Sequence, residues 1–226
     1  MGKDWIGNSR SGMYGLGASN RSKRDREELD FYATPPIATE ALLKKLDEVG
    51  IKLPTKILEP AVGMGHIASV LKKHGYQVEA ADVVDRNWPG TKIQNFLDTE
   101  SIDCDAIITN PPYAYGAQFV VKAMDLLKDD QYCCMLLKIQ FMEGKERGDL
   151  LFKSGLNPEW CFVFSGRINC AKQGNFKGNN EVFEAATQGE DISDYDEPEA
   201  DTGGQIAYAW YVWHKGYEGY TKTVWI

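Results

Sequence analysis

The chain has 226 residues, of which 43% are hydrophobic and 26% charged, the composition of an ordinary globular protein with one sizeable core. No apolar run reaches the roughly 18 residues of a membrane-spanning helix, and the polar N-terminus lacks the apolar core of a signal peptide, so we expect a cytoplasmic protein without a membrane partner. The five cysteines are Cys104, Cys133, Cys134, Cys161 and Cys170. They form no Cys-x-x-Cys pair, which favours buried reduced thiols over a zinc site, so no metal site is predicted.

The net charge of −8 argues at first against a nucleic-acid partner, but the negative charge is concentrated in one segment. Of the 33 acidic residues, nine lie between Gly178 and His214, where no Lys or Arg occurs. The rest of the chain therefore contains 24 acidic and 25 basic residues. That balance is compatible with a local basic face. We interpret residues 178–204 as an acidic loop insertion, and mimicry of nucleic acid or masking of the site is the alternative.

Residues 1–29 are rich in Gly, Ser, Asn and charge and show no periodicity, which predicts an irregular, partly basic arm. The basic cluster in this arm belongs either to a solvated tail or to a segment that contacts phosphates: Arg21, Lys23, Arg24 and Arg26. A single domain over residues 30–226 is predicted to follow.

The first elements of this domain follow the order helix, strand, helix, strand. The first helix is predicted to start at Thr34, which precedes two prolines, and to end at Gly50. The next segments are, in order, a strand over 56–61, a glycine-rich turn over 62–65, a helix over 66–74 and a strand over 77–84 with an acid near its end. This is the order of the nucleotide-binding half of a doubly wound sheet.

Strands and helices continue to alternate along the rest of the chain. We predict strands over 92–97, 104–109, 132–141, 160–168 and 205–214, a candidate short final strand over 220–226, and helices over 117–127 and 145–154. The apolar run 132–141 is typical of a central parallel strand that is buried on both faces. The sequence therefore predicts an α/β fold with a doubly wound, mostly parallel, seven-stranded sheet and helices on both faces.

Polar residues mark the carboxyl ends of the first four predicted strands, where ligands of open α/β sheets bind. One crevice is expected to contain Glu59, Gly63, Gly65, Asp82, Asn95, Asp98 and Asn110. The turn lacks the third glycine of the dinucleotide pattern, and two glycines suffice for close approach by a smaller zwitterionic group. Asp82 would accept hydrogen bonds from ribose hydroxyls. These features suit S-adenosylmethionine better than NAD.

Asn110, Pro111, Pro112 and Tyr113 follow a buried strand and form the candidate catalytic motif. Proline removes a backbone donor, so carbonyls near it stay available to a ligand. The Asn110 side-chain oxygen and the Pro111 carbonyl would accept from an NH2 group on a planar ring, and Tyr113 would stack on that ring. A base inside a duplex cannot reach such a pocket, so base flipping is implied. A plain strand-ending turn is the alternative for Asn-Pro-Pro alone.

These motifs resemble those of the class I S-adenosylmethionine-dependent amino-methyltransferases and, more closely, of the phage-encoded DNA N6-adenine methyltransferases. Residues 30–35 match the family's cofactor motif, residues 59–65 its glycine motif and residues 110–113 its catalytic Asn-Pro-Pro-Tyr motif, in the order of the gamma type. Residues 137–145 and 209–213 look like later blocks, and the resemblance covers roughly residues 30–168 and 205–226. The family usually has an acid where this chain has Asn95.

The resemblance implies a Rossmann-like class I methyltransferase fold, S-adenosylmethionine as cofactor, and the N6 amine of adenine in duplex DNA as substrate. We expect a monomer that acts in the cytoplasm, of the host if the chain is phage-encoded. The implied cofactor-binding residues are Phe31, Thr34, Pro35, Glu59, Pro60, Gly63, Gly65, Asp82, Val83, Asn95 and Phe96. Candidates for phosphate contacts, each with a solvated charge as the alternative, are Lys138, Lys145, Arg147 and Arg167.

Two other functions stay open at this point. The same tetrapeptide serves the methylation of RNA bases and of glutamine amides in proteins, so the enzyme class does not specify the substrate. A catalytically silent nucleic-acid-binding protein with the methyltransferase fold is the third hypothesis. The intact Asn110 and Tyr113 argue against this last hypothesis.

Overall fold

One eight-stranded sheet organises the computed structural model, which describes residues 32–166, 168, 170–172 and 206–226. The arm predicted for residues 1–29 and the acidic insertion predicted for 178–204 lie outside the described residues. In spatial order the strands are β10 (Lys222–Trp225), β7 (Trp160–Val163), β9 (Tyr208–His214), β6 (Tyr132–Lys138), β5 (Ala106–Thr109), β2 (Lys56–Glu59), β3 (Gln77–Asp82) and β4 (Lys92–Ile93).

The sheet is parallel except where β9 is inserted between β6 and β7 and runs antiparallel to both. The predicted mostly parallel, doubly wound sheet is confirmed, but the predicted count of seven strands is wrong by one. The eighth strand is β10, which pairs with β7 from Lys222 opposite Trp160 to Trp225 opposite Val163. This short terminal segment adds to the outer edge of the sheet, where sequence patterning is weakest.

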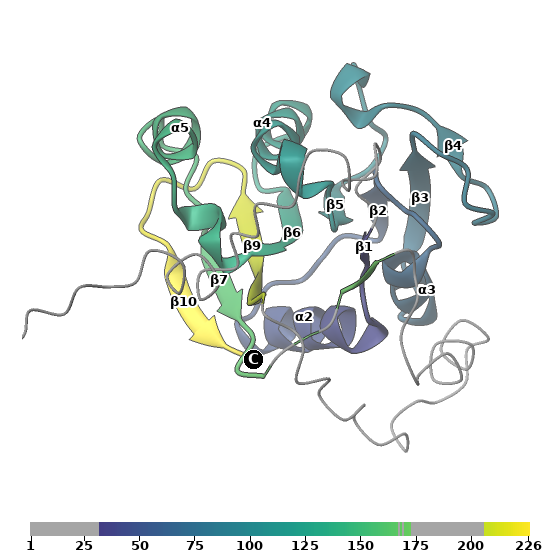
Figure 1. Ribbon diagram of the computed structural model, residues 1–226, viewed down its shortest axis with the longest axis horizontal. Helices are drawn as coiled ribbons and strands as arrows, with labels where there is room; N and C mark the ends of the chain where they lie inside the picture. Colours follow the sequence, from purple (N-terminus) through teal and green to yellow (C-terminus); the bar gives the residue numbers. More distant parts are fainter. Residues whose placement is uncertain (1–31, 167, 169, 173–205) are drawn as a thin grey trace, which may run out of the picture. The chain divides into compact units, whose positions relative to one another are not determined.

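Helices cover both faces of the sheet, as predicted (Figure 1). The helical elements are α2 (Pro36–Glu48), α3 (His66–Lys73), α4 (Gly116–Leu126), α5 (Lys145–Arg147) and the π-helical turn η4 (Gly148–Phe152). Alternate residues of β6 pack on opposite sides: Met135 lies in one apolar cluster with residues of α4 and η4, and Leu136 lies in another with residues of α2 and α3. The apolar run in β6 therefore reflects burial on both faces.

Every strand of the large sheet is shorter than its predicted range, and two of them, β4 and β6, are followed by 3-10 helices. β4 stops at Ile93, and the Asn95 side chain accepts a hydrogen bond from the Leu97 N–H (3.2 Å) and donates one to Asp98 (2.8 Å). These bonds stabilise the 3-10 turn η1 (Phe96–Asp98), and β6 is likewise followed by η3 (Ile139–Met142). Local side-chain capping of this kind competes with strand formation.

The two tryptophans of β9, Trp210 and Trp213, belong to the core. Trp210 is fully buried and its Nε1 donates to the Ala38 carbonyl of α2 at 2.7 Å, while Trp213 donates to the Leu156 carbonyl at 3.2 Å. The prediction that the cysteines are buried is confirmed for four of the five, and Cys170 is half-buried. Within the described part of the chain, no helix combines the length and apolar character that membrane crossing requires.

A small second sheet, which the sequence did not indicate, joins distant segments. Strand β1 (Tyr32–Ala33) pairs antiparallel with β8 (Ala171–Lys172), so that Tyr32 lies opposite Lys172. This pairing restrains the backbone immediately before α2, a segment that becomes important at the candidate site.

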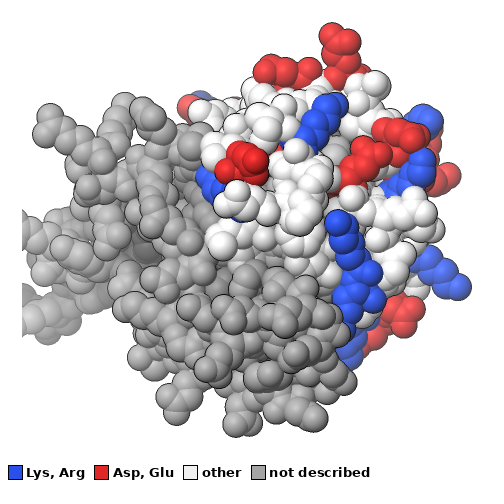
Figure 2. Space-filling view, turned by 90° about the vertical axis from the view of Figure 1, so that its right-hand side faces the viewer, with Lys and Arg blue, Asp and Glu red and all other residues white. Residues whose placement is uncertain are grey.

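The side of the molecule near β3, β4 and α3 carries charges of both signs. Figure 2 shows lysine, arginine, aspartate and glutamate side chains intermingled over the described part of this face. A uniformly basic surface for a polyanion is therefore not formed by the described residues seen in this view.

Candidate active site

The strand order reverses between β2 and β5, and the motif residues gather beyond the carboxyl ends of these two strands. From β2 the chain adds β3 and β4 on one side, and it then returns to place β5 and β6 on the other. Leu58 of β2 pairs with Ile107 of β5 in parallel register, so Glu59 and Asn110 leave the sheet at the same edge. This switch point is where open α/β sheets bind their ligands.

The Asn110 side chain is held in one orientation by the segment before α2. Its Nδ2 donates to the Tyr32 backbone carbonyl at 2.9 Å and to the Thr34 hydroxyl at 3.0 Å. Its Oδ1 is buried and has no hydrogen-bond partner among the described residues. The amide therefore presents a desolvated acceptor at the switch point, which suits a ligand that brings a donor.

Tyr113 lies in an aromatic cluster directly after the two prolines. Its ring centroid is 5.4 Å from that of Tyr32 and 5.8 Å from that of Tyr208, and the Lys138 ammonium lies over the ring at 4.7 Å. Burial raises the pKa of the Tyr113 hydroxyl well above its ordinary value of 10.0, so the phenol stays protonated at neutral pH. Tyr113 is thus suited to packing and not to proton abstraction.

Glu59 ends β2 with a buried carboxyl group. It is 1% exposed, and its Oε2 has no hydrogen-bond partner among the described residues. Burial raises the pKa of Glu59 well above its ordinary value of 4.5; a hydrogen bond from the Ala68 backbone opposes this shift, and the nearby Asp82 charge adds to it. His66, the first residue of α3, is also buried; burial lowers its pKa to about 4, so it is neutral at pH 7. A cationic ligand group beside Glu59 would provide the positive counter-charge that favours its carboxylate form.

Asp82 ties the glycine-rich turn to the end of β3. Its Oδ2 accepts from the Gly63 N–H at 2.8 Å, and its Oδ1 accepts from the Val84 N–H at 3.0 Å and from Arg86 at 3.2 Å. Asp82 is 6% exposed. Asp82, which is predicted to bind a ribose, therefore also holds the turn through Gly63. Both roles are compatible because each carboxylate oxygen can accept more than one hydrogen bond.

The second glycine of the turn makes room for a tryptophan of the protein itself. Gly65 has a φ of 85°, and a Cβ placed on it would lie 1.9 Å from Cε3 of Trp88. Trp88 packs with Val62, Ala68 and Ala80 beside α3. Gly65 was predicted to allow close approach of a ligand. Packing of the Trp88 ring against the turn is a second reason for glycine at this position, and the sequence did not indicate it.

We expect Gly65→Ala to lower the free energy of unfolding by about 2–4 kcal/mol, because it adds left-handed backbone strain to a collision with the Trp88 ring. Removing the ring with Trp88→Ala should reduce the cost of Gly65→Ala to about 1 kcal/mol, the backbone part alone. Urea unfolding of both single variants and the double variant measures this coupling. An equal cost of Gly65→Ala in both backgrounds would show that the ring does not impose the glycine.

The other predicted cofactor residues occupy different environments. Val83 is 49% exposed directly after Asp82, where an apolar ligand ring could cover it. Asn95 is exposed and serves as the cap of η1, whereas Phe96 is buried against Phe119, with ring centroids 4.9 Å apart. The structure thus gives Asn95 a local capping role and Phe96 a core role. Phe31 lies outside the described residues.

Three of the four predicted phosphate-binding residues are described, and they have different surroundings. Lys138 lies over Tyr113, and Lys145 is exposed at the start of α5. Arg147 donates to the backbone carbonyls of Gln140, Phe141 and Glu143, so the geometry favours a structural role for its guanidinium over the predicted phosphate contact. Arg167 lies outside the described residues.

Several site residues were not predicted from the sequence. Arg86 stands four residues after Asp82 and could have been suspected as its ion-pair partner. Trp88 and Tyr208 carry no local signal of their contacts, and Tyr32 contributes through its backbone carbonyl, which no side-chain pattern indicates.

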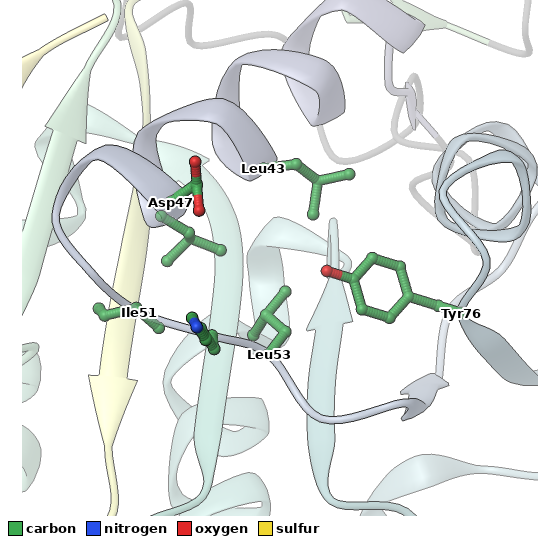
Figure 3. Close-up of a pocket in the computed structure, with 7 residues that line it drawn as sticks. Leu43, Asp47, Ile51, Leu53 and Tyr76 are labelled. Carbon is green, nitrogen blue, oxygen red and sulfur yellow. The ribbon is translucent and has the colours of Figure 1, made fainter.

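A pocket of about 240 Å³ lies away from these residues (Figure 3). Leu43 and Asp47 of α2, Ile51 and Leu53 before β2, and Tyr76 before β3 line it. Because Leu53 and Tyr76 lead into the amino ends of their strands, this pocket belongs to the edge of the sheet opposite the switch point.

Comparisons with solved structures identify the fold. The chain is similar to the methyltransferase subunit of a type I restriction-modification system from Streptococcus thermophilus, with TM-score 0.58 and 12% identity over 88% of this chain and 48% of that one. It is also similar to a candidate class I S-adenosylmethionine-dependent methyltransferase from Listeria monocytogenes, with TM-score 0.55 and 13% identity over 95% of this chain and 71% of that one.

A third similar structure is the modification subunit of a candidate type I restriction enzyme from Vibrio vulnificus YJ016, with TM-score 0.54 and 12% identity over 96% of this chain and 51% of that one. Neither a family model nor a curated protein sequence matches the chain. The predicted Rossmann-like class I methyltransferase fold is confirmed. The chain spans about half the length of the Streptococcus and Vibrio proteins.

Proposed function

We propose that this protein transfers a methyl group from S-adenosylmethionine to the N6 amine of adenine in DNA, on a base flipped out of the duplex. The observation that carries the proposal is the Asn110 amide, whose nitrogen is held by Tyr32 and Thr34 while its oxygen is a buried, unsatisfied acceptor among the described residues. An NH2 group can donate to this oxygen, whereas a ring carbonyl cannot.

The catalytic motif compensates for the poor nucleophilicity of an aromatic amine. Its lone pair is delocalised into the ring, and hydrogen bonds from the NH2 group to Asn110 Oδ1 and the Pro111 carbonyl favour a pyramidal nitrogen with a free lone pair. Bound S-adenosylmethionine supplies a methyl group on a sulfonium, which is its own leaving group, so the motif needs no strong general base. Orienting the amine is therefore the main contribution of these residues.

Tyr113 is proposed to stack on the target base. In the described conformation the Lys138 ammonium lies over its ring, so stacking on that face displaces Lys138 from its cation–π contact. The displaced ammonium is proposed to contact a phosphate of the DNA, so Lys138 stays a proposed substrate contact.

The residues around the turn fit the proposed cofactor. The unsatisfied Glu59 Oε2 suits the α-ammonium group of an amino-acid tail, and the turn of Gly63 and Gly65 is held beside it by Asp82. Val83 offers an exposed apolar surface next to the Asp82 carboxylate, the combination that an adenosine requires. Pro35, Pro60 and Asn95 stay proposed cofactor contacts, and Asn95 combines this proposed role with the capping of η1.

We expect the affinity for S-adenosylmethionine to rise with pH between the ordinary glutamate pKa of 4.5 and the raised pKa of Glu59. In the free protein the raised pKa keeps Glu59 protonated in this range. A bound ammonium group favours the carboxylate, so binding releases a proton and acid weakens it. Glu59→Gln should bind more weakly at the upper end of the range and should not release this proton.

Calorimetric titration at one pH in two buffers of different ionisation enthalpy measures the released proton. Glu79→Gln, which removes an exposed carboxylate of β3, is the matched control and should behave like the wild type. Equal proton release by the wild type and by Glu59→Gln would contradict the assignment of Glu59 to the ammonium group.

DNA is favoured over RNA and protein as the substrate because one similar structure is named as the methyltransferase subunit of a type I restriction-modification system and another as the modification subunit of a candidate type I restriction enzyme. The basic cluster within residues 1–29 is proposed to contact phosphates, and residues 178–204 are proposed to form an acidic surface insertion in the domain of residues 30–226. We further propose that the protein is a monomer that acts on duplex DNA in the cytoplasm. The resemblance of the motifs supports the proposal that it is a phage-type enzyme.

Methyl transfer from labelled S-adenosylmethionine to separate pools of duplex DNA, structured RNA and protein extract tests the proposal. The pools are digested after incubation, and the labelled products are separated by chromatography. Labelled N6-methyladenine from DNA is the expected product, and it should be lost with Asn110→Ala. Label found only in RNA or in glutamine, or no transfer to any pool, would overturn the proposal.

A further inference from the structure

We propose that Thr34 is a positioning residue, which with the Tyr32 backbone carbonyl fixes the Asn110 amide so that its oxygen faces the substrate. This inference rests on the proposed function in assigning the amide to an NH2 substrate. It differs from the expectation drawn from the sequence, which placed Thr34 among the residues that bind the cofactor.

The hydrogen-bond partners determine which way the amide points. A backbone carbonyl can only accept, so the Asn110 atom 2.9 Å from the Tyr32 oxygen must be the donating nitrogen. The Thr34 hydroxyl, 3.0 Å from the same nitrogen, accepts its second hydrogen. Rotating the amide by half a turn would bring two oxygen acceptors together at Tyr32 and lose that bond, and the Thr34 hydroxyl would have to change from acceptor to donor.

Thr34 is free for this task because it does not cap the helix that follows. Pro35 occupies the cap position of α2, and the cap has no side-chain hydrogen bond. Thr34 itself is 3% exposed, so water does not compete with Asn110 for its hydroxyl oxygen. The expectation that Thr34 starts the helix is therefore wrong, since α2 starts at Pro36. The Thr34 side chain instead contacts Asn110, 76 positions away in the sequence.

Both anchors of the amide are restrained by the fold. The Tyr32 backbone belongs to β1, which pairs with β8, and Thr34 is followed by the two prolines that lead into α2. Proline limits the backbone freedom of the residue before it, so Thr34 has few alternative conformations. The catalytic amide is thus oriented before any substrate arrives, which avoids an ordering cost during the reaction.

Thr34→Val and Thr34→Ser separate positioning from cofactor binding. Valine has nearly the same shape as threonine but cannot accept a hydrogen bond, whereas serine keeps the hydroxyl. With Thr34→Val we expect turnover on adenine-containing DNA to fall about 10-fold, the scale of one hydrogen bond, while the Kd for S-adenosylhomocysteine stays within about twofold. Thr34→Ser should restore most of the turnover. Thermal unfolding shows whether each variant folds, and Thr34→Ala replaces the valine variant if valine is not accommodated.

A second measurement does not depend on activity. In protein labelled with 15N at asparagine, the Asn110 side-chain NH2 signals are identified by their loss in Asn110→Ala. We expect slow solvent exchange for both hydrogens in the wild type and in Thr34→Ser, and faster exchange of one of them in Thr34→Val.

The two proposals can fail separately. Unchanged Asn110 exchange in Thr34→Val, or a 10-fold rise in the Kd for S-adenosylhomocysteine with normal turnover, overturns the positioning role of Thr34. If the wild type transfers no methyl group to DNA, the proposed function fails, and the exchange measurement still decides whether Thr34 orients the amide.

Discussion

Asn110→Ala is expected to lower the turnover of methyl transfer by about 10²–10³-fold, the scale seen when one preorganised polar group is removed from an active site. The loss follows from the geometry, because alanine removes the buried acceptor that Oδ1 provides at the switch point. The same change leaves the Glu59 and Asp82 side of the crevice intact, so the cofactor Kd should change by less than about twofold. Single-turnover transfer and calorimetric binding of S-adenosylhomocysteine measure the two quantities.

The matched control is Asn157→Ala, which removes a half-buried asparagine between η4 and β7, outside the site. It should leave both turnover and cofactor affinity close to those of the wild type. Comparable losses of turnover and cofactor affinity in Asn110→Ala would mean that the residue supports the cofactor pocket and not the substrate amine.

Asp82→Ala is expected to produce the opposite pattern, with a cofactor Kd raised about 100-fold. The substitution leaves the Gly63 and Val84 N–H groups without their acceptor and removes the proposed ribose acceptor. The loss of hydrogen bonds to the two ribose hydroxyls, at about 1.5 kcal/mol each, corresponds to about 100-fold in affinity. Turnover at saturating cofactor should fall much less, because Asn110 and its anchors are unaffected. Calorimetry and initial rates at several cofactor concentrations test this expectation.

Asp85→Ala is a suitable control because Asp85 lies three residues farther along the same segment. It is exposed, and its Oδ1 accepts from the Asn87 N–H at 2.8 Å, so its loss affects a surface turn only. If Asp82→Ala and Asp85→Ala changed the cofactor Kd equally, the turn held by Asp82 would not be part of the cofactor site.

The fold could be predicted well because its signals are local. The apolar runs of β2, β5 and β6 and the glycine or proline residues that bound them identify the strands and helices without knowledge of distant contacts. One error arises where a side chain overrides the pattern, because Asn95 ends a strand by capping η1. Strand β10 was only a candidate because an edge strand has one neighbour and a weak burial pattern.

The sequence by itself determined the class of fold and the positions of the glycine turn, Asp82 and the Asn-Pro-Pro-Tyr motif, since each is encoded in consecutive residues. Only the tertiary structure decided what those residues contact. The orientation of Asn110 depends on Tyr32 and Thr34, 78 and 76 residues away, and the need for glycine at 65 depends on the Trp88 ring. Such contacts arise from the way the parallel sheet brings its carboxyl ends together, and no local pattern carries that information.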